Sequence, residues 1–217
     1  MTITTMNGHT IESHPTAPEG TVAAWTQYGA TDFPRDSIIL CRNTAPLVAF
    51  AYCLLQRDVP CRILGRDIGA TLISIIKKLR CIDIEDFFLK LQTWSDREAD
   101  RCFKEDRSPE RIYDQAECLR FFANSLDEES RTVDSLIAKI ELMFTDDPQA
   151  NRVTLSTVHK AKGLEFNTVF ILDREKYMPS RYAIQDWQKV QERNLLYVAV
   201  TRSKNTLIYI SSECWKQ

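Results

Sequence analysis

Three short stretches of this 217-residue chain place polar and charged side chains beside apolar runs. "CRNT" at 41–44 follows one run, "TVHKAKGLEF" at 157–166 lies between two, and "QERNLLYVAVTRSK" at 191–204 ends in basic residues. The side chains that stand out are Arg42, Thr44, Thr157, His159, Lys160, Lys162, Arg202 and Lys204. Because hydroxyl, guanidinium and ammonium groups bind phosphate, the chemistry to look for is recognition of a phosphate-bearing ligand.

Short apolar runs and amphipathic patterns predict the elements that position these stretches. We expect strands at 21–27, 36–42, 59–65, 152–157, 168–173 and 206–211. We expect helices at 44–58, 67–80, 83–106, 108–126, 131–144 and 184–204. Thr44 is a candidate N-cap of the first helix, and Pro46 stands in its first turn. Strand–helix–strand order with short joints predicts an α/β fold with a parallel sheet flanked by helices.

The four helices after Gly65 interrupt the strand pattern and predict an all-helical insertion. We expect a lead-in at 1–20, an α/β domain made of 21–65 and 149–217, and an insertion subdomain at 66–148 with its own apolar contacts. Residues 81–150 carry 18 acidic and 9 basic side chains, a balance of −9, whereas the rest of the chain has a balance of +7. A phosphate-bearing partner therefore favours the flanks, unless the charge blocks are only solvated faces.

In open parallel sheets, ligand sites lie where strands end in polar residues before a helix. "CRNT" fits this rule, but it can also be a solvated strand end. The second stretch can be a polar loop with a surface histidine at His159. The third can be a buried helix with charged ends, although Arg202 ends a nearly continuous apolar stretch and should emerge at the rim of the sheet.

Composition limits the class of protein. No run of about 18 apolar residues is present, so we expect no membrane span, and the N-terminus lacks the pattern of a signal peptide. The seven cysteines form no C-x-x-C pair, which predicts reduced thiols used as small apolar side chains in an intracellular, cytoplasmic protein. We expect no metal site built from them.

"TVHKAKGLEF" and "ERNLLYVAVTRSK", in this order, closely resemble motifs V and VI of UvrD/Rep-type superfamily 1 DNA helicases. The segment "IILCRNTAPLVAFAYCLLQRDVPCRILGRDIG" also resembles that family, so the resemblance covers about residues 36–80 and 150–212. It implies the second of two RecA-like domains, with a helical subdomain inserted where the acidic helices fall here.

The resemblance also implies roles for single residues. Arg202 looks like the arginine finger that acts on the γ-phosphate of ATP, and Glu165 like the carboxylate that binds the ribose. Gly163 lets the backbone come close to a ligand. The positions that resemble contacts to single-stranded DNA are Arg42, Thr44, Thr157 and His159. The second stretch is then polar because one side faces ATP and the other faces DNA.

The six glycines are never followed by lysine, so the 217 residues hold no G-x-x-x-x-G-K-[ST] loop for phosphates. "TVFILD", which ends at Asp173, is interpreted as a core strand rather than a Walker B strand. We therefore expect a monomer that binds single-stranded DNA and hydrolyses no ATP alone. ATP with Mg²⁺ is held mainly by an N-terminal RecA-like domain, in the same or a separate chain. The alternative is a non-catalytic nucleic-acid-binding or interaction module that retains a helicase fold.

Overall fold

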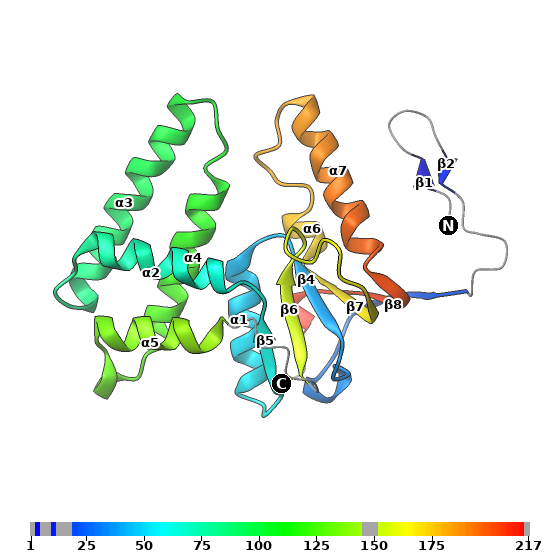
Figure 1. Cartoon of the computed structure of the whole chain (residues 1–217), viewed down its shortest axis with the longest axis horizontal. Coiled ribbons are helices and arrows are strands. Elements are labelled where there is room, and N and C mark those ends of the chain that lie inside the picture. The colour runs from blue at the N-terminus through cyan, green and yellow to red at the C-terminus, as the bar shows by residue number, and fades with distance from the viewer. Residues whose placement is uncertain (1–2, 5–9, 12–18, 145–151, 215–217) are drawn as a thin grey trace.

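The computed structural model describes residues 3–4, 10–11, 19–144 and 152–214, and it has the predicted α/β architecture (Figure 1). A six-stranded sheet has the order β3-β8-β7-β4-β6-β5, and every pair in it is parallel. Its strands are β3 (Thr21–Trp25), β4 (Ile38–Cys41), β5 (Cys61–Ile63), β6 (Val153–Thr157), β7 (Phe166–Leu172) and β8 (Ser203–Ile210). The pair β1 (Ile3–Thr4) and β2 (Thr10–Ile11) is antiparallel and separate.

Helices cover both faces of the sheet and build the insertion. They are α1 (Thr44–Leu55), α2 (Arg66–Leu79), α3 (Ile84–Lys104), α4 (Glu110–Asn124), α5 (Val133–Met143), α6 (Arg174–Tyr177) and α7 (Asp186–Val200). The predicted helix at 184–204 is too long, because α7 ends at Val200 and β8 begins at Ser203. Asp173 directly follows β7 and is buried, as expected of the end of a core strand.

The central strand β4 shows why a short apolar run was a reliable signal. All four of its residues are buried, and they alternate between two apolar clusters. Ile39 and Cys41 belong to the cluster that includes α1, whereas Ile38 and Leu40 belong to the cluster that includes α7. A strand covered on both faces requires apolar side chains at every position, so no alternation of polar and apolar residues is present.

The insertion has the apolar contacts expected of it, but it does not form a core of its own. Phe87, Phe122 and Ile140 belong to the same buried cluster as Leu155 and Phe170 of the sheet. Helix α4 packs against α1, where the rings of Phe121 and Tyr52 lie 5.7 Å apart between centroids. The hydrophobic core is therefore continuous between the helices and the sheet. The boundaries at 66 and 148 stay predictions, and residue 148 lies outside the described residues.

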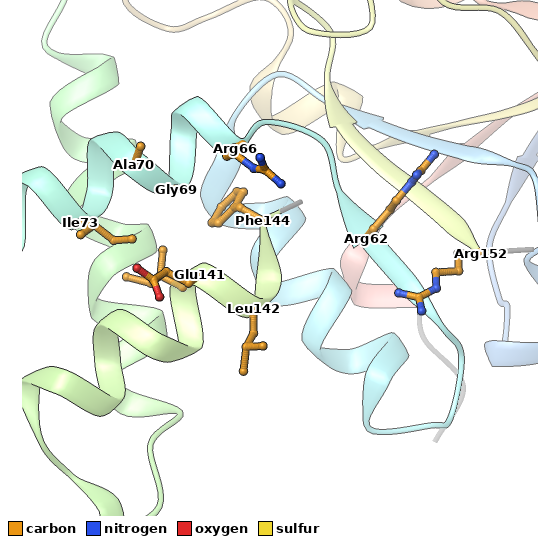
Figure 2. Close-up of a pocket in the computed structure, with 10 residues that line it drawn as sticks. Arg62, Arg66, Gly69, Ala70, Ile73, Glu141, Leu142, Phe144 and Arg152 are labelled. Atoms are coloured by element: carbon orange, nitrogen blue, oxygen red, sulfur yellow. The ribbon is translucent and has the colours of Figure 1, made fainter. Parts of the chain in front are cut away.

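Glycine allows α2 and α5 to come close together. A β-carbon on Gly69 would lie 3.0 Å from the β-carbon of Phe144, which is tighter than normal packing. Figure 2 shows Phe144 beneath α2 at the end of α5, with Arg66 nearby. The single glycine of α2 is thus a packing position.

Buried cysteines fill space in this core, as the sequence predicted. Burial raises the pKa of the Cys41 and Cys61 thiols to about 12, so both are protonated and unreactive at neutral pH. Neither forms a disulfide.

Asp114 of α4 caps helix α1 from outside. Its carboxylate accepts hydrogen bonds from the backbone N–H groups of Thr44 and Ala45, both at 2.9 Å. These N–H groups have no partner within their own helix, and an anion here also complements the helix dipole. The N-cap is Asn43, which makes no side-chain capping bond, so the predicted capping role of Thr44 is wrong. The insertion therefore completes a helix of the sheet domain.

A second connection is the charge network around Arg42, at the end of β4. Its Nε and Nη2 donate to both oxygens of Glu192 on α7, at 2.8 and 2.7 Å. Its Nη1 lies 2.9 Å from Glu110 Oε2 on α4, and its side chain is only 15% exposed. The backbone N–H of Ser180 donates to Glu192, and the Ser180 hydroxyl donates to Glu110. Arg42, Glu110, Ser180 and Glu192, termed the Arg42 network below, join the sheet, the insertion and α7.

The contacts in this network favour the charged forms of Arg42 and Glu192. Burial alone would raise the pKa of Glu192, but the hydrogen bonds from Arg42 and Ser180 outweigh it and hold this pKa below the usual value. Burial likewise opposes the charge on Arg42, and the two carboxylates outweigh it and raise the pKa of the guanidinium. Arg42 and Glu192 are therefore both charged at neutral pH.

Removing the external cap should destabilise the whole chain. We expect Asp114→Ala to lower the free energy of unfolding by about 1–3 kcal/mol, because two buried N–H groups lose their acceptor. Glu117→Ala, an exposed change one turn further along α4, is the control and should stay within about 0.5 kcal/mol of wild type. Chemical denaturation measures both. Equal effects from the two variants would show that the cap contributes nothing.

The Arg42 network should make stability depend on pH. Because the pKa of Glu192 is lower in the folded chain than its ordinary value of 4.5, its stabilising effect is complete above that value and lost as the pH falls through the folded pKa. We expect Glu192→Gln to cost about 2 kcal/mol at pH 7 and clearly less near pH 4. The exposed change Glu128→Gln should show no such pH dependence. A gap that widens on acidification would contradict the assigned ion pairs.

Candidate functional site

The predicted site residues separate into two groups at opposite edges of the sheet. Cys41 pairs with Thr157, so the residues after β4 and β6 share the carboxyl edge. Phe166 pairs with Ser203, so Glu165 and Arg202 lie at the amino edge, where β7 and β8 begin. The seven residues of β7, from Phe166 to Leu172, put these edges about 20 Å apart.

The stretch between β6 and β7 crosses the sheet from one edge to the other. It begins where the Val158 N–H donates to the Cys41 carbonyl at 3.0 Å, and it continues in tight turns rather than in a helix. Val158 and Ala161 are buried in the cluster beneath α7, whereas Lys162 and Gly163 are exposed. One short stretch thus presents polar groups at both edges because its middle is anchored in the core.

Arg202 is held at the amino edge by neutral groups. Its Nε donates to the Val198 carbonyl at 3.0 Å and its Nη1 to the Leu164 carbonyl at 3.0 Å. Its Nη2 donates to the hydroxyl of Thr201 at 3.1 Å. No carboxylate pairs with it among residues 19–144 and 152–214. The guanidinium is thereby oriented while its charge stays uncompensated and two of its five N–H groups remain for a ligand.

Glu165 lies at the start of β7, where the next residue, Phe166, donates its N–H to the carbonyl of Arg202. Its carboxylate is exposed and pairs with Lys204 at 3.6 Å, with both side chains more than half exposed. Such a pair is weak, so either partner can turn to a ligand at small cost. Gly163 adopts φ +89, and a β-carbon there would meet no atom within 4 Å. A side chain at 163 would be strained and would project into open space beside Glu165.

The carboxyl edge holds Thr157 and His159. Thr157 is buried at the end of β6, where its carbonyl accepts from the N–H groups of Lys160 and Ala161 at 3.0 Å. His159 is exposed as a residue, but its ring is partly desolvated. That burial, with the nearby charge of Arg42, lowers the pKa of His159, and Glu192 opposes the shift. At neutral pH the imidazole is uncharged and can both donate and accept a hydrogen bond.

Arg42 and Thr44 lie at the same edge but are already engaged within the protein. Four donor contacts of Arg42 go to Glu192, Glu110 and Asn43. The Thr44 backbone is bound to Asp114, and the residue is only 8% exposed. The DNA contacts predicted for these two residues stay predictions, and the geometry favours an indirect role through the shape of the turn.

Lys160 connects the same edge to the insertion. Its ammonium lies 2.7 Å from Asp67 Oδ2 in the first turn of α2, and this contact lowers the pKa of Asp67. The pair is exposed, so its contribution to stability is small. Together with Glu110 and Asp114, however, it gives the insertion three polar contacts to residues beside the carboxyl edge.

The sequence did not identify the acidic partners in this arrangement. Glu192 was visible only as a charged residue next to an apolar helix stretch, and Glu110, Asp114 and Ser180 carried no signal. The available hint for Glu192 was its spacing: it lies three residues before Leu195 and four before Leu196, on the same side of the helix. A carboxylate on that side becomes buried, and a buried charge without a partner is costly.

The described residues contain neither a cluster of metal ligands nor a membrane-spanning helix. Within the described ranges, no three His, Cys, Asp or Glu side chains gather as metal ligands would. No helix in those ranges is both long enough and apolar enough to cross a membrane.

The chain is similar to known helicases. A family model described as the UvrD-like helicase C-terminal domain matches residues 77–213. An ATP-dependent DNA helicase PcrA from Staphylococcus epidermidis is 43% identical over 82 residues, which cover 36% of this chain and 11% of that protein. An ATP-dependent DNA helicase Rep from Buchnera aphidicola is 40% identical over 70 residues, covering 32% and 10%.

A PcrA from Staphylococcus aureus gives a similar result, with 43% identity over 77 residues. The matched part spans about a tenth of the length of these curated relatives. The family model, in contrast, covers well over half of this chain and includes α3, α4 and α7, with Thr157, His159, Glu165 and Arg202, but not Arg42 or Thr44. The chain therefore belongs to the family of UvrD-like helicase C-terminal domains.

Proposed function

We propose that this chain is the second RecA-like domain of an ATP-dependent DNA helicase or translocase. The observation that carries the proposal is Arg202, which is oriented by three neutral acceptors and pairs with no carboxylate of the described residues. A guanidinium held in this way can bind a negatively charged group of a partner without first breaking an internal ion pair. Membership of the helicase family and similarity to ATP-dependent DNA helicases support ATP as the source of that charge.

Arg202 acts as an arginine finger in this proposal. Its donor fork would bind oxygens of the γ-phosphate across an interface with a first RecA-like domain. Negative charge that develops there during phosphoryl transfer is stabilised by a cation already in position, an effect worth roughly 10³ to 10⁵ in rate. Arginine suits this role because it stays charged at any physiological pH.

Glu165 and Gly163 complete the nucleotide side. The carboxylate of Glu165 would accept hydrogen bonds from ribose hydroxyls after leaving Lys204, and the open space at Gly163 lets the ligand approach the backbone. ATP with Mg²⁺, when bound, supplies the phosphoryl group and most of the countercharge. The 217 residues hold no phosphate-cradling loop, so this chain alone should bind ATP weakly and hydrolyse none.

The carboxyl edge is proposed to contact single-stranded DNA. The neutral imidazole of His159 can hydrogen-bond a base or sugar, and Thr157 with its turn offers backbone and hydroxyl groups to a phosphate. The surplus of basic residues in the flanks favours such a polyanion. Half of a DNA track would give weak affinity that falls with added salt.

Two continuous elements link the proposed DNA edge to the proposed ATP edge. One is the crossing stretch from Thr157 to Glu165, and the other is α7, which runs from Glu192 at the Arg42 network to the turn that carries Arg202 (Figure 1). The helix covers about 12 Å between Glu192 and Val200. A ligand that moves either end would therefore displace groups at the other.

A non-catalytic DNA-binding module is the alternative, and one observation separates the two. A pure DNA binder would have no use for an uncompensated guanidinium held 20 Å or so from the DNA edge. The variants below distinguish them, since a module would lose DNA binding but no catalytic rate.

The first test is the division of labour between the edges. In a chain joined to, or mixed with, a RecA-like domain that carries the phosphate-cradling loop, Arg202→Ala should lower kcat by roughly 10³-fold with little change in DNA affinity. Arg202→Lys should restore little of the rate, because a point charge does not reproduce the donor fork. His159→Ala should weaken DNA binding and DNA stimulation while basal hydrolysis stays nearly unchanged.

Lys204→Ala serves as the matched control, because it removes a neighbouring exposed cation from the same edge. It should change kcat far less than Arg202→Ala. Equal loss of basal hydrolysis from Arg202→Ala and His159→Ala would show that the edges do not divide the two ligands.

The second test asks whether Arg42 touches DNA or only shapes the turn. Arg42→Lys keeps a positive charge but loses the two-pronged contact to Glu192, whereas Glu192→Gln weakens the same contact from the other side. If the role is indirect, both variants should lower stability and reduce DNA affinity to a similar, small extent. Fluorescence anisotropy with a labelled oligothymidylate at several salt concentrations measures this. A loss of affinity confined to Arg42→Lys would establish a direct contact.

A further inference from the structure

A groove in the insertion stands apart from both edges of the sheet. It lies between α2, α3 and α4, which Figure 1 shows together at the end of the molecule opposite α7 and β8. Its volume is about 780 Å³, in the range of pockets that hold a ligand or a peptide segment. Arg111 and Ile112 of α4 line it, whereas Asp114 and Phe121 of the same helix face α1.

The rim of this groove is strongly basic, although the surrounding insertion is acidic. The basic side chains that line it are Lys78, Lys90, Arg97, Arg101, Arg107 and Arg111. Glu98 is the one acidic side chain in the lining. Residues 66–148 carry 19 acidic and 13 basic side chains, so six cations around one groove form a local reversal of charge, and such a reversal attracts a negatively charged partner.

Internal acids neutralise only part of the rim. Lys90 pairs with Asp86 at 2.7 Å, Arg97 with Glu98 at 3.2 Å, and Arg101 with Glu105 at 3.3 Å.

Arg107 also pairs with Glu105, so two cations share that carboxylate. Lys78 and Arg111 are exposed and have no hydrogen bond or ion pair to any residue in the described ranges. These two face the groove from different helices. They are the positions where an incoming carboxylate would find an unpaired cation.

The floor of the groove is apolar. Ile75 and Cys102 are buried there, and Leu79, Trp94 and Ile112 are partly exposed within the lining. A basic rim over an apolar floor fits a ligand that has both negative charge and large apolar side chains.

A nucleic-acid strand fits this lining less well than a peptide does. Its evenly spaced phosphates would pass Glu98 and Glu105 and then the acidic faces of the insertion, where they are repelled. A short peptide can instead place a few carboxylates near Lys78 and Arg111 and bury its apolar groups on the floor. We propose that the groove between α2, α3 and α4 is a docking site for a short acidic peptide segment of another protein, anchored by one or two large apolar residues.

The proposal can be tested on the 217-residue chain by fluorescence anisotropy. The probe is the fluorescein-labelled peptide Glu-Asp-Glu-Asp-Leu-Phe, which should bind with an affinity that falls as salt is added. One comparison peptide replaces the four acids with Gln and Asn, and the other replaces Leu-Phe with Gly-Ser. Both should bind at least about tenfold more weakly than the acidic probe. The first lacks the carboxylates, and the second lacks the apolar side chains.

Variants locate the site. The double change Lys78→Ala with Arg111→Ala should weaken binding of the acidic probe by about tenfold or more, since it removes both unpaired cations. Lys104→Ala, an exposed cation of α3 outside the lining, should leave the affinity unchanged. Circular dichroism and the unfolding midpoint establish that the variants keep the fold.

Two outcomes would overturn the proposal. One is the absence of binding at the groove, seen either as a failure of the acidic probe to bind at millimolar concentration or as binding that the double variant leaves unchanged. The other is preferential binding of a labelled twelve-nucleotide oligothymidylate that the same double variant removes, which would make the groove a nucleic-acid site. Neither outcome bears on Arg202, so the proposed helicase role would stand or fall separately.

Discussion

The pairing of Arg42 with Glu192 and Glu110 is the constraint on which the arrangement of this domain depends. One guanidinium at the end of a central strand binds a carboxylate from α7 and another from the insertion. Removing any member would leave a largely buried charge without its partner, which is far more costly than the pair itself is stabilising. The three segments must therefore keep one relative position, and that position fixes where the two polar edges lie.

The two edges follow from how a parallel sheet is connected. A connection between parallel strands has to return from the carboxyl edge to the amino edge, and most connections use a helix for this. Here the return from β6 to β7 is a stretch of eight residues that runs in tight turns and is anchored by Val158 and Ala161. This stretch is polar at both of its ends and is held in the core at Val158 and Ala161, so it presents polar groups at both edges of the sheet.

The strands and most helices were predictable because burial on both faces and amphipathic periodicity are local properties. Helix α7 was predicted too long, since the turn at Thr201 and Arg202 and the polar first residues of β8, from Ser203, were assigned to the end of the helix. Arg202 stood out from its place after an apolar run, whereas Glu165 and Gly163 were identified by motif resemblance alone. The position of these residues at the opposite edge from Thr157 and His159 could not be derived from local patterns, because it depends on which strands are neighbours. The pairing of Arg42 was hidden for the same reason: Glu192 lies 150 residues away along the chain.

The cap on α1 has a consequence for exchanging parts between relatives. A chimera that replaced 66–148 with a different helical segment would keep every strand of the sheet and every motif residue at both edges. It would nevertheless remove Asp114 from the first turn of α1 and Glu110 from Arg42, since both belong to the replaced segment. The insertion is thus continuous with the sheet domain in chemistry as well as in packing. Grafting in this family would succeed only when the carboxylates of the donor segment arrive at the same two places.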